Sequence, residues 1–124
     1  MKGRAALALG VLLLAALQAQ PALAHSKLVR SSPAARGTVA QAPARVQLWF
    51  NERIEPAFAE LSVWSKAGAR VDSGDLEVDP DDPLAISVGV APLAPGVYTV
   101  RYRVLSVDGH VAEADFTFTV TPAR

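Results

Sequence analysis

The sequence predicts an all-β fold, an antiparallel β-sandwich or barrel of about seven strands. Three observations predict it. Apolar residues alternate with polar or small ones in several short runs. Turn-forming pairs rich in Pro, Gly and Asp separate these runs at intervals of about eight to twelve residues. After residue 24, no apolar stripe with the period of a helix extends over ten residues or more.

The first two predicted strands lie in the first half of the chain. Residues 46–50 place Val46, Leu48 and Phe50 on one face of a strand, because successive side chains point to opposite faces. Residues 61–63 repeat the pattern, with Leu61 and Val63 on either side of a serine. A turn pair precedes the first run at Ala42-Pro43 and another follows the second run at Ala67-Gly68, as expected of short strands in a sandwich.

Three further strands are predicted in the second half, at 84–90, 97–104 and 116–120. Each shows apolar residues at every second position for most of its length, which indicates one buried face. We therefore expect the strands to share one core to which these residues contribute: Val46, Leu48, Phe50, Leu61, Val63, Val100, Phe116 and Phe118.

A tyrosine near the start of a late strand refines the fold. Tyr98 follows the turn pair Pro95-Gly96 and opens the strand at 97–104. This position resembles the tyrosine corner of immunoglobulin-like sandwiches. The expected architecture is therefore immunoglobulin-like.

The first 24 residues have the three parts of a secretory signal. Lys2 and Arg4 precede an uncharged apolar run at 5–17, and a small-x-small sequence ends at Ala24. The apolar run is short for a membrane span, which takes about 20 residues. We expect cleavage after Ala24, which divides the chain into a signal peptide, 1–24, and one exported domain, 25–124.

Composition excludes several function classes. The 124 residues carry 12 basic and 12 acidic side chains and no cysteine. The balanced charge gives no electrostatic footprint for nucleic acid. Disulfides, thiolate metal sites and cysteine nucleophiles are excluded together. An acidic segment at 72–82 fits no EF-hand spacing, and we expect a solvated loop there.

Two histidines offer metal donors. His25 would become the N-terminal residue, so that its α-amine and imidazole can chelate one ion. Asp108 and His110 are two residues apart with Gly109 between them, and residues at that spacing face one side of a strand. Nitrogen and carboxylate donors suit Cu(II). The alternative is that His25 is incidental to the cleavage site and residues 108–110 are only a hairpin turn.

Residues 25–124 resemble the CopC family of periplasmic copper-binding proteins over nearly their whole length. The matching segments begin with the histidine at the signal cleavage site, and each one alone would be a weak signal. In chain order they are 25–34, 43–52, 92–100, 106–110 and 116–120.

The resemblance implies a seven-stranded Greek-key sandwich or barrel with a Cu(II) site. The implied ligands are His25, with its amine, Asp108 and His110, and Glu52 is a further oxygen candidate. The only methionine is Met1, so no thioether ligands for Cu(I) remain after cleavage. The implied role is periplasmic copper sequestration, resistance or delivery to a CopD-type membrane importer, without enzymatic activity.

Two other functions fit parts of the same sequence. A copper monooxygenase with a histidine brace also begins at a histidine, but residues 25–124 leave little room for substrate-binding loops. A metal-free immunoglobulin-like interaction module would leave His25 and residues 108–110 unrelated in space. The separation of His25 and His110 distinguishes the module from the two copper proteins, and turnover with a reductant distinguishes the enzyme.

Overall fold

The computed structural model describes residues 27–122, in which eight strands and one short 3-10 helix form. No helix in this part of the chain is long and apolar enough to cross a membrane. The elements, in chain order, are β1 (Leu28–Ser32), β2 (Thr38–Val39), β3 (Arg45–Phe50), η1 (Pro56–Phe58), β4 (Glu60–Ser65), β5 (Glu77–Asp79), β6 (Asp82–Gly89), β7 (Gly96–Leu105) and β8 (Val111–Val120).

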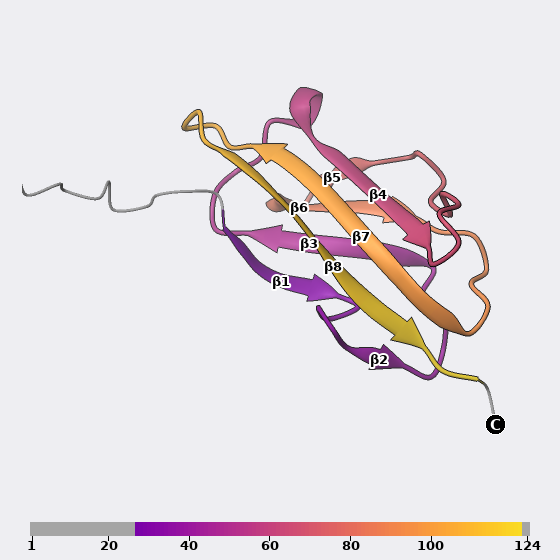
Figure 1. The fold of residues 1–124 in the computed structure, drawn as a ribbon. Helices are drawn as coiled ribbons and strands as arrows, with labels where there is room; N and C mark the ends of the chain where they lie inside the picture. The colour runs from indigo at the N-terminus through magenta and orange to yellow at the C-terminus, as the bar shows by residue number, and fades with distance from the viewer. Residues whose placement is uncertain (1–26, 123–124) are drawn as a thin grey trace, which may run out of the picture.

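The strands make two four-stranded sheets that face each other (Figure 1). One sheet has the order β1-β3-β6-β5 and the other the order β2-β8-β7-β4. The sequence predicted a β-sandwich or a barrel, and the structure confirms the sandwich. One pair departs from the antiparallel expectation, since the two-residue strand β2 runs parallel to β8. The departure arises because the turn after β1 carries the chain across to the other sheet instead of folding it back on β1 (Figure 1).

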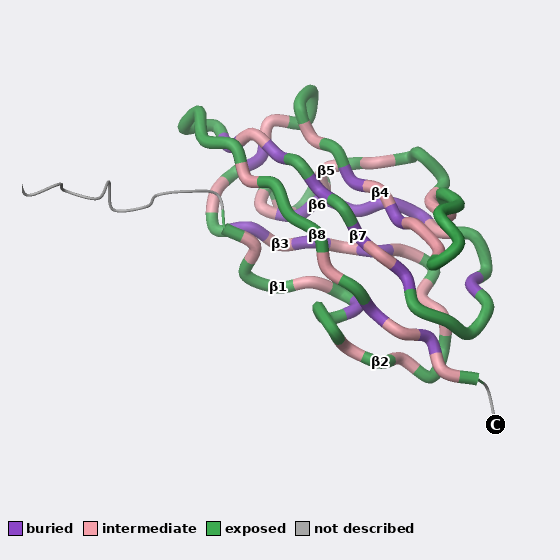
Figure 2. Tube along the Cα trace, viewed as in Figure 1, coloured by how far each residue is buried: buried purple, intermediate pink, exposed green. Residues whose placement is uncertain are grey.

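The core lies between the sheets and contains the residues that alternation predicted (Figure 2). Seven of the eight predicted core residues are buried, and Phe116 is partly buried and packs against them. Tyr98 also belongs to this core, and its hydroxyl donates a hydrogen bond of 2.6 Å to the carbonyl of Ala94. The tyrosine corner is therefore present.

Strand β6 is buried on both faces, which alternation did not predict. Its residues 85–89 are all buried. Outside the sandwich, Ala85 lies opposite Trp49 in the neighbouring strand, and Ser87 accepts hydrogen bonds of 3.2 and 3.1 Å from the Arg45 guanidinium. Small residues on the outer face of a central strand can be covered in this way by long side chains from the adjacent strand.

The acidic segment 72–82 is more ordered than a solvated loop, so that expectation is wrong in part. Residues 77–79 form β5, and the side chain of Asp72 is fully buried. Its carboxylate accepts hydrogen bonds from Arg70 Nε at 2.8 Å and from the amides of Val63 at 2.9 Å and Gly74 at 3.0 Å. Burial opposes ionisation, but these bonds outweigh it and lower the pKa of Asp72 below its usual value.

Candidate metal centre

The turn between β7 and β8 carries both of the described side chains that the sequence proposed as ligands. Two backbone hydrogen bonds close it, from the Ser106 amide to the His110 carbonyl and from the Gly109 amide to the Ser106 carbonyl, each 2.9 Å long. Gly109 has φ of 91°, a conformation that side chains disfavour, and a Cβ there would meet nothing within 4 Å. Glycine is favoured at this position by its backbone geometry and not by lack of space for a side chain.

Asp108 and His110 are in direct contact in this turn. His110 Nδ1 lies 3.1 Å from Asp108 Oδ1, and the His110 amide donates to the same oxygen at 3.2 Å. The Ser106 hydroxyl also donates to Asp108 Oδ1. The Ser106 bond lowers the pKa of Asp108, and the His110 bonds lower it further, against the opposing effect of burial. The carboxylate is therefore held ionised, as a metal ligand must be.

A second loop, 51–55, packs against this turn. The amide of Val107 donates to the Arg53 carbonyl, and the amide of Glu55 donates to the Leu105 carbonyl, both at 2.9 Å. Between them Ile54 is buried and forms a β-bridge with Ser106. The loop is thus fixed on one side of the turn that carries Asp108 and His110. It also contains Glu52, which is half-buried.

The beginning of the described chain is attached to the same loop. The Lys27 amide donates to Asn51 Oδ1 at 2.7 Å, and the Asn51 amide donates to the Lys27 carbonyl at 3.1 Å. The start of β1 and the tip of the β7–β8 hairpin therefore lie at one end of the sandwich (Figure 1). His25 lies outside the described residues, two positions before Lys27.

The donors within the described residues do not make a metal centre by themselves. Across 27–122, no group of three or more His, Asp or Glu side chains is placed to hold one ion. Asp108 and His110 supply one oxygen and one ring nitrogen from the same turn. A stable copper site requires further donors, and the sequence proposed them at His25, which lies outside the described residues.

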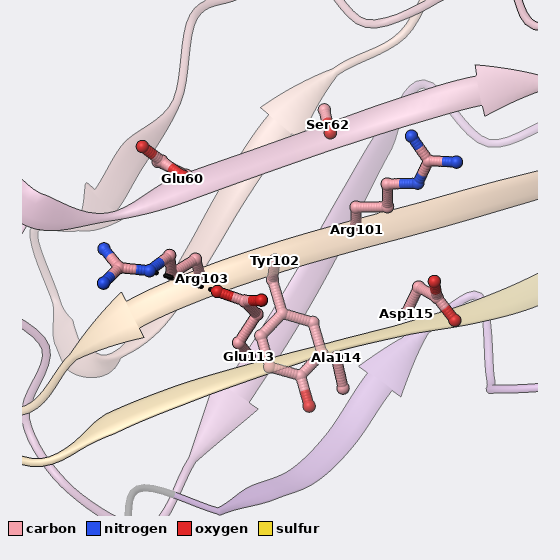
Figure 3. Close-up of a pocket in the computed structure, with 8 residues that line it drawn as sticks. All are labelled: Glu60, Ser62, Arg101, Tyr102, Arg103, Glu113, Ala114 and Asp115. Carbon is pink, nitrogen blue, oxygen red and sulfur yellow. Dashed lines mark ion pairs between the residues drawn. The ribbon is translucent and has the colours of Figure 1, made fainter.

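A shallow groove on the outer face of β4, β7 and β8 is a separate feature (Figure 3). Its charged side chains come from three neighbouring strands. Arg103 lies between Glu60 and Glu113 in the strand register and pairs with Glu113 at 3.1 Å. This face has the mixed charges of a solvated sheet surface, and it contains neither Asp108 nor His110.

These observations define a small β-sandwich with an Asp-x-His turn at the end where its N-terminus enters. The chain belongs to the CopC family, whose CopC domain model matches residues 28–121.

Named relatives and solved structures agree with this family. Copper resistance protein C of Xanthomonas campestris pv. juglandis is 34% identical over 125 residues, which cover 89% of this chain and 91% of that protein. The copper transport protein CutJ of Bacillus subtilis (strain 168) is 32% identical over 101 residues. That match covers 81% of this chain but only 19% of CutJ.

Two crystal structures share the fold. CopC from Methylosinus trichosporium OB3b aligns with a TM-score of 0.71 and 38% identity, covering 81% of this chain and 97% of that one. PcoC, a copper resistance protein from Escherichia coli, aligns with a TM-score of 0.68 and 28% identity, covering 77% and 99% of the two chains.

Proposed function

We propose that this chain is an exported copper-binding protein that holds one Cu(II) ion between its N-terminus and the β7–β8 turn. The ligands are the α-amine and imidazole of His25, a carboxylate oxygen of Asp108 and a ring nitrogen of His110. Support comes from the contact between Asp108 and His110 and from relatives named for copper resistance and copper transport.

The two hydrogen bonds between Lys27 and Asn51 are the observation that supports this proposal most strongly. Loop 51–55 contacts Lys27 on one side and the turn at 105–107 on the other. Consecutive Cα atoms are about 3.8 Å apart, so His25 lies within roughly 8 Å of Lys27 along the chain. This short tether supports the proposal, because the loop that holds Lys27 also contacts the turn that carries Asp108 and His110.

The donor chemistry fits Cu(II). Three nitrogens and one oxygen match its preference for tetragonal sites, and Cu(II) has the highest affinity in the divalent series. The 3.1 Å contact of His110 Nδ1 with Asp108 assigns the proton to Nδ1, which places the ring's lone pair on Nε2. Such a carboxylate contact fixes the ring orientation of a ligating histidine. The α-amine of His25 exists only after cleavage behind Ala24.

The role we propose is copper sequestration or delivery in the periplasm, with a CopD-type membrane importer as the receiving partner. Four protein donors fill the plane that Cu(II) prefers, and a copper enzyme needs a position for its substrate. Glu52 lies next to Asn51 in the supporting loop, and we assign it at most a weak additional contact. Copper loading would release protons from the nitrogen donors, so affinity should fall as the medium becomes acidic.

The proposal is tested on the exported protein, with mass spectrometry to establish that it begins at His25. Cu(II) is added in competition with a chromophoric chelator, and the electron paramagnetic resonance spectrum of the loaded protein is recorded. We expect one tightly bound ion with a tetragonal spectrum showing nitrogen hyperfine structure. Binding no tighter than that of an unrelated protein beginning with histidine would contradict the proposal.

A further inference from the structure

Taken as a whole residue, backbone included, Ser106 is the most deeply buried polar residue that the structure describes. Within 27–122 two polar residues are buried, Ser87 at 7% exposure and Ser106 at 1%. A buried hydroxyl is destabilising unless it makes hydrogen bonds. Ser106 directly follows β7, next to the turn that carries the proposed ligands.

The bonds of Ser106 converge on those ligands. Its hydroxyl donates to Asp108 Oδ1 and accepts from the His110 amide at 3.3 Å. Asp108 Oδ1 also receives the His110 amide at 3.2 Å and faces His110 Nδ1 at 3.1 Å. Three donors therefore meet at one carboxylate oxygen. Oδ2 is the oxygen that a metal could take up without displacing any of them.

The turn itself does not depend on the Ser106 hydroxyl. It is closed by the backbone bonds between Ser106, Gly109 and His110, and the backbone of Ser106 also bridges to Ile54. Removing the hydroxyl leaves all of these in place. Asp108, with its side chain about one-third exposed, would lose its one bond from a buried side chain.

We propose that Ser106 is a positioning residue for copper, which fixes the Asp108 carboxylate and, through it, the imidazole of His110 before the metal arrives. The inference rests on the proposed function and adds to it a residue that touches no metal. A ligand pair fixed in advance loses less conformational entropy on binding, so the hydroxyl contributes to affinity without donating to the ion.

The first test compares Ser106→Ala with Ser87→Ala in the cleaved chain. Ser87 is also buried and accepts two bonds from Arg45, but it lies in the other sheet. We expect Ser106→Ala to raise the Cu(II) dissociation constant about tenfold, and Ser87→Ala to change it by less than about twofold. Equal effects of the two variants would overturn the positioning role.

A second measurement separates positioning from a general loss of structure. In the Asp108→Ala background, adding Ser106→Ala should weaken copper binding by less than about threefold, because the hydroxyl acts mainly through Asp108. An undiminished tenfold effect there would show that Ser106 acts by another route.

A third readout needs no metal. In the copper-free protein we expect Ser106→Ala to reduce the hydrogen-exchange protection of the His110 amide while amides of β3 stay protected. Unchanged protection of His110 would overturn the inference even if wild-type protein binds copper. Failure of the wild type to bind Cu(II) would instead overturn the proposed function, and the copper role of Ser106 with it.

Discussion

At the scale of single residues, Oδ1 of Asp108 organises the end of the β7–β8 hairpin. It receives the Ser106 hydroxyl, the His110 amide and the His110 ring. Because these bonds favour the ionised carboxylate, the pKa of Asp108 lies below its usual value. Asp108 is therefore available as an anionic oxygen donor throughout the neutral range.

The first prediction ranks the proposed ligands. His110→Ala removes a nitrogen donor and should weaken Cu(II) binding most. Asp108→Ala removes an oxygen that water can partly replace and should cost less. Glu52→Ala should have the smallest effect. A Cu(II) competition titration checks the order, with circular dichroism as the folding control, and a folded His110→Ala protein that binds like wild type would contradict the site.

The second prediction concerns Asp72, which is not part of the proposed copper site. Asp72→Ala leaves the buried amide of Val63 without its acceptor and should lower the free energy of unfolding by about 2 kcal/mol at neutral pH. Because the pKa of Asp72 is lower in the folded protein, its contribution is present above the unfolded value of about 4 and is lost as the pH falls through the folded value.

Urea unfolding at several pH values measures this, with Asp81→Ala as the matched control. Asp81 is exposed, and its removal should change stability by less than about 0.5 kcal/mol. The difference between wild type and Asp72→Ala should narrow below about pH 4. A difference that grows in acid would mean that the sign of the pKa shift is wrong.

The spacing in the sequence could predict that Asp108 and His110 lie together. It could not identify the residues that hold them in place. The Asp-x-His pattern survives as a direct contact because a glycine with positive φ turns the chain between them. Ser106 gives no such signal, since a serine before a turn is ordinary and only burial shows its role. The same holds for Asp72, which appears in the sequence as one of several acidic residues.

At the scale of elements, the longest strands are inner ones, β6 in one sheet and β7 and β8 in the other. The ten-residue strands β7 and β8 pair along their whole length and carry the turn with Asp108 and His110 at one end. The Tyr98 hydroxyl ties the other end of this hairpin to the Ala94 carbonyl. The two ends are therefore independent, one closed by a tyrosine corner and the other by the Asp108 turn.

The third prediction tests that independence. Tyr98→Phe removes the bond to Ala94 and should lower the free energy of unfolding by about 1 kcal/mol, leaving Cu(II) affinity unchanged. Tyr102→Phe is the matched control, since Tyr102 lies on the same strand and burial raises the pKa of its hydroxyl. Thermal unfolding should show the larger loss for Tyr98→Phe, and an equal or larger loss for Tyr102→Phe would argue against the tyrosine corner as the stabilising feature.

Alternation predicted most of the longer strands well and missed the short edge strands β1, β2 and β5. The runs at 46–50, 61–63 and 97–104 correspond to β3, β4 and β7 within a few residues. Strand β8 begins five residues before its predicted start. Alternation missed residues 111–115 because they lie mostly exposed near the hairpin tip and show no buried face. The two-residue strand β2 is defined by its pairing with β8, and two residues are too few to show an alternating pattern.

At the scale of the whole molecule, loop 51–55 joins the start of the described chain to the β7–β8 hairpin. It contacts Lys27 through Asn51 and the turn through Arg53 and Glu55. The loop thereby links Lys27 to a turn about eighty positions later. The sequence alone could suggest ligands on both sides of this loop, but the loop contacts themselves are encoded by no motif.

The most direct measurement compares the chain that begins at His25 with the same chain carrying one added serine before it. The extension turns the α-amine of His25 into an amide and moves the new amine one residue away, while every described contact of the sandwich stays the same. We predict that Cu(II) affinity falls at least about tenfold and that the resonance spectrum loses one nitrogen donor. Equal affinity and identical spectra for the two proteins would contradict a copper site built on the N-terminal histidine.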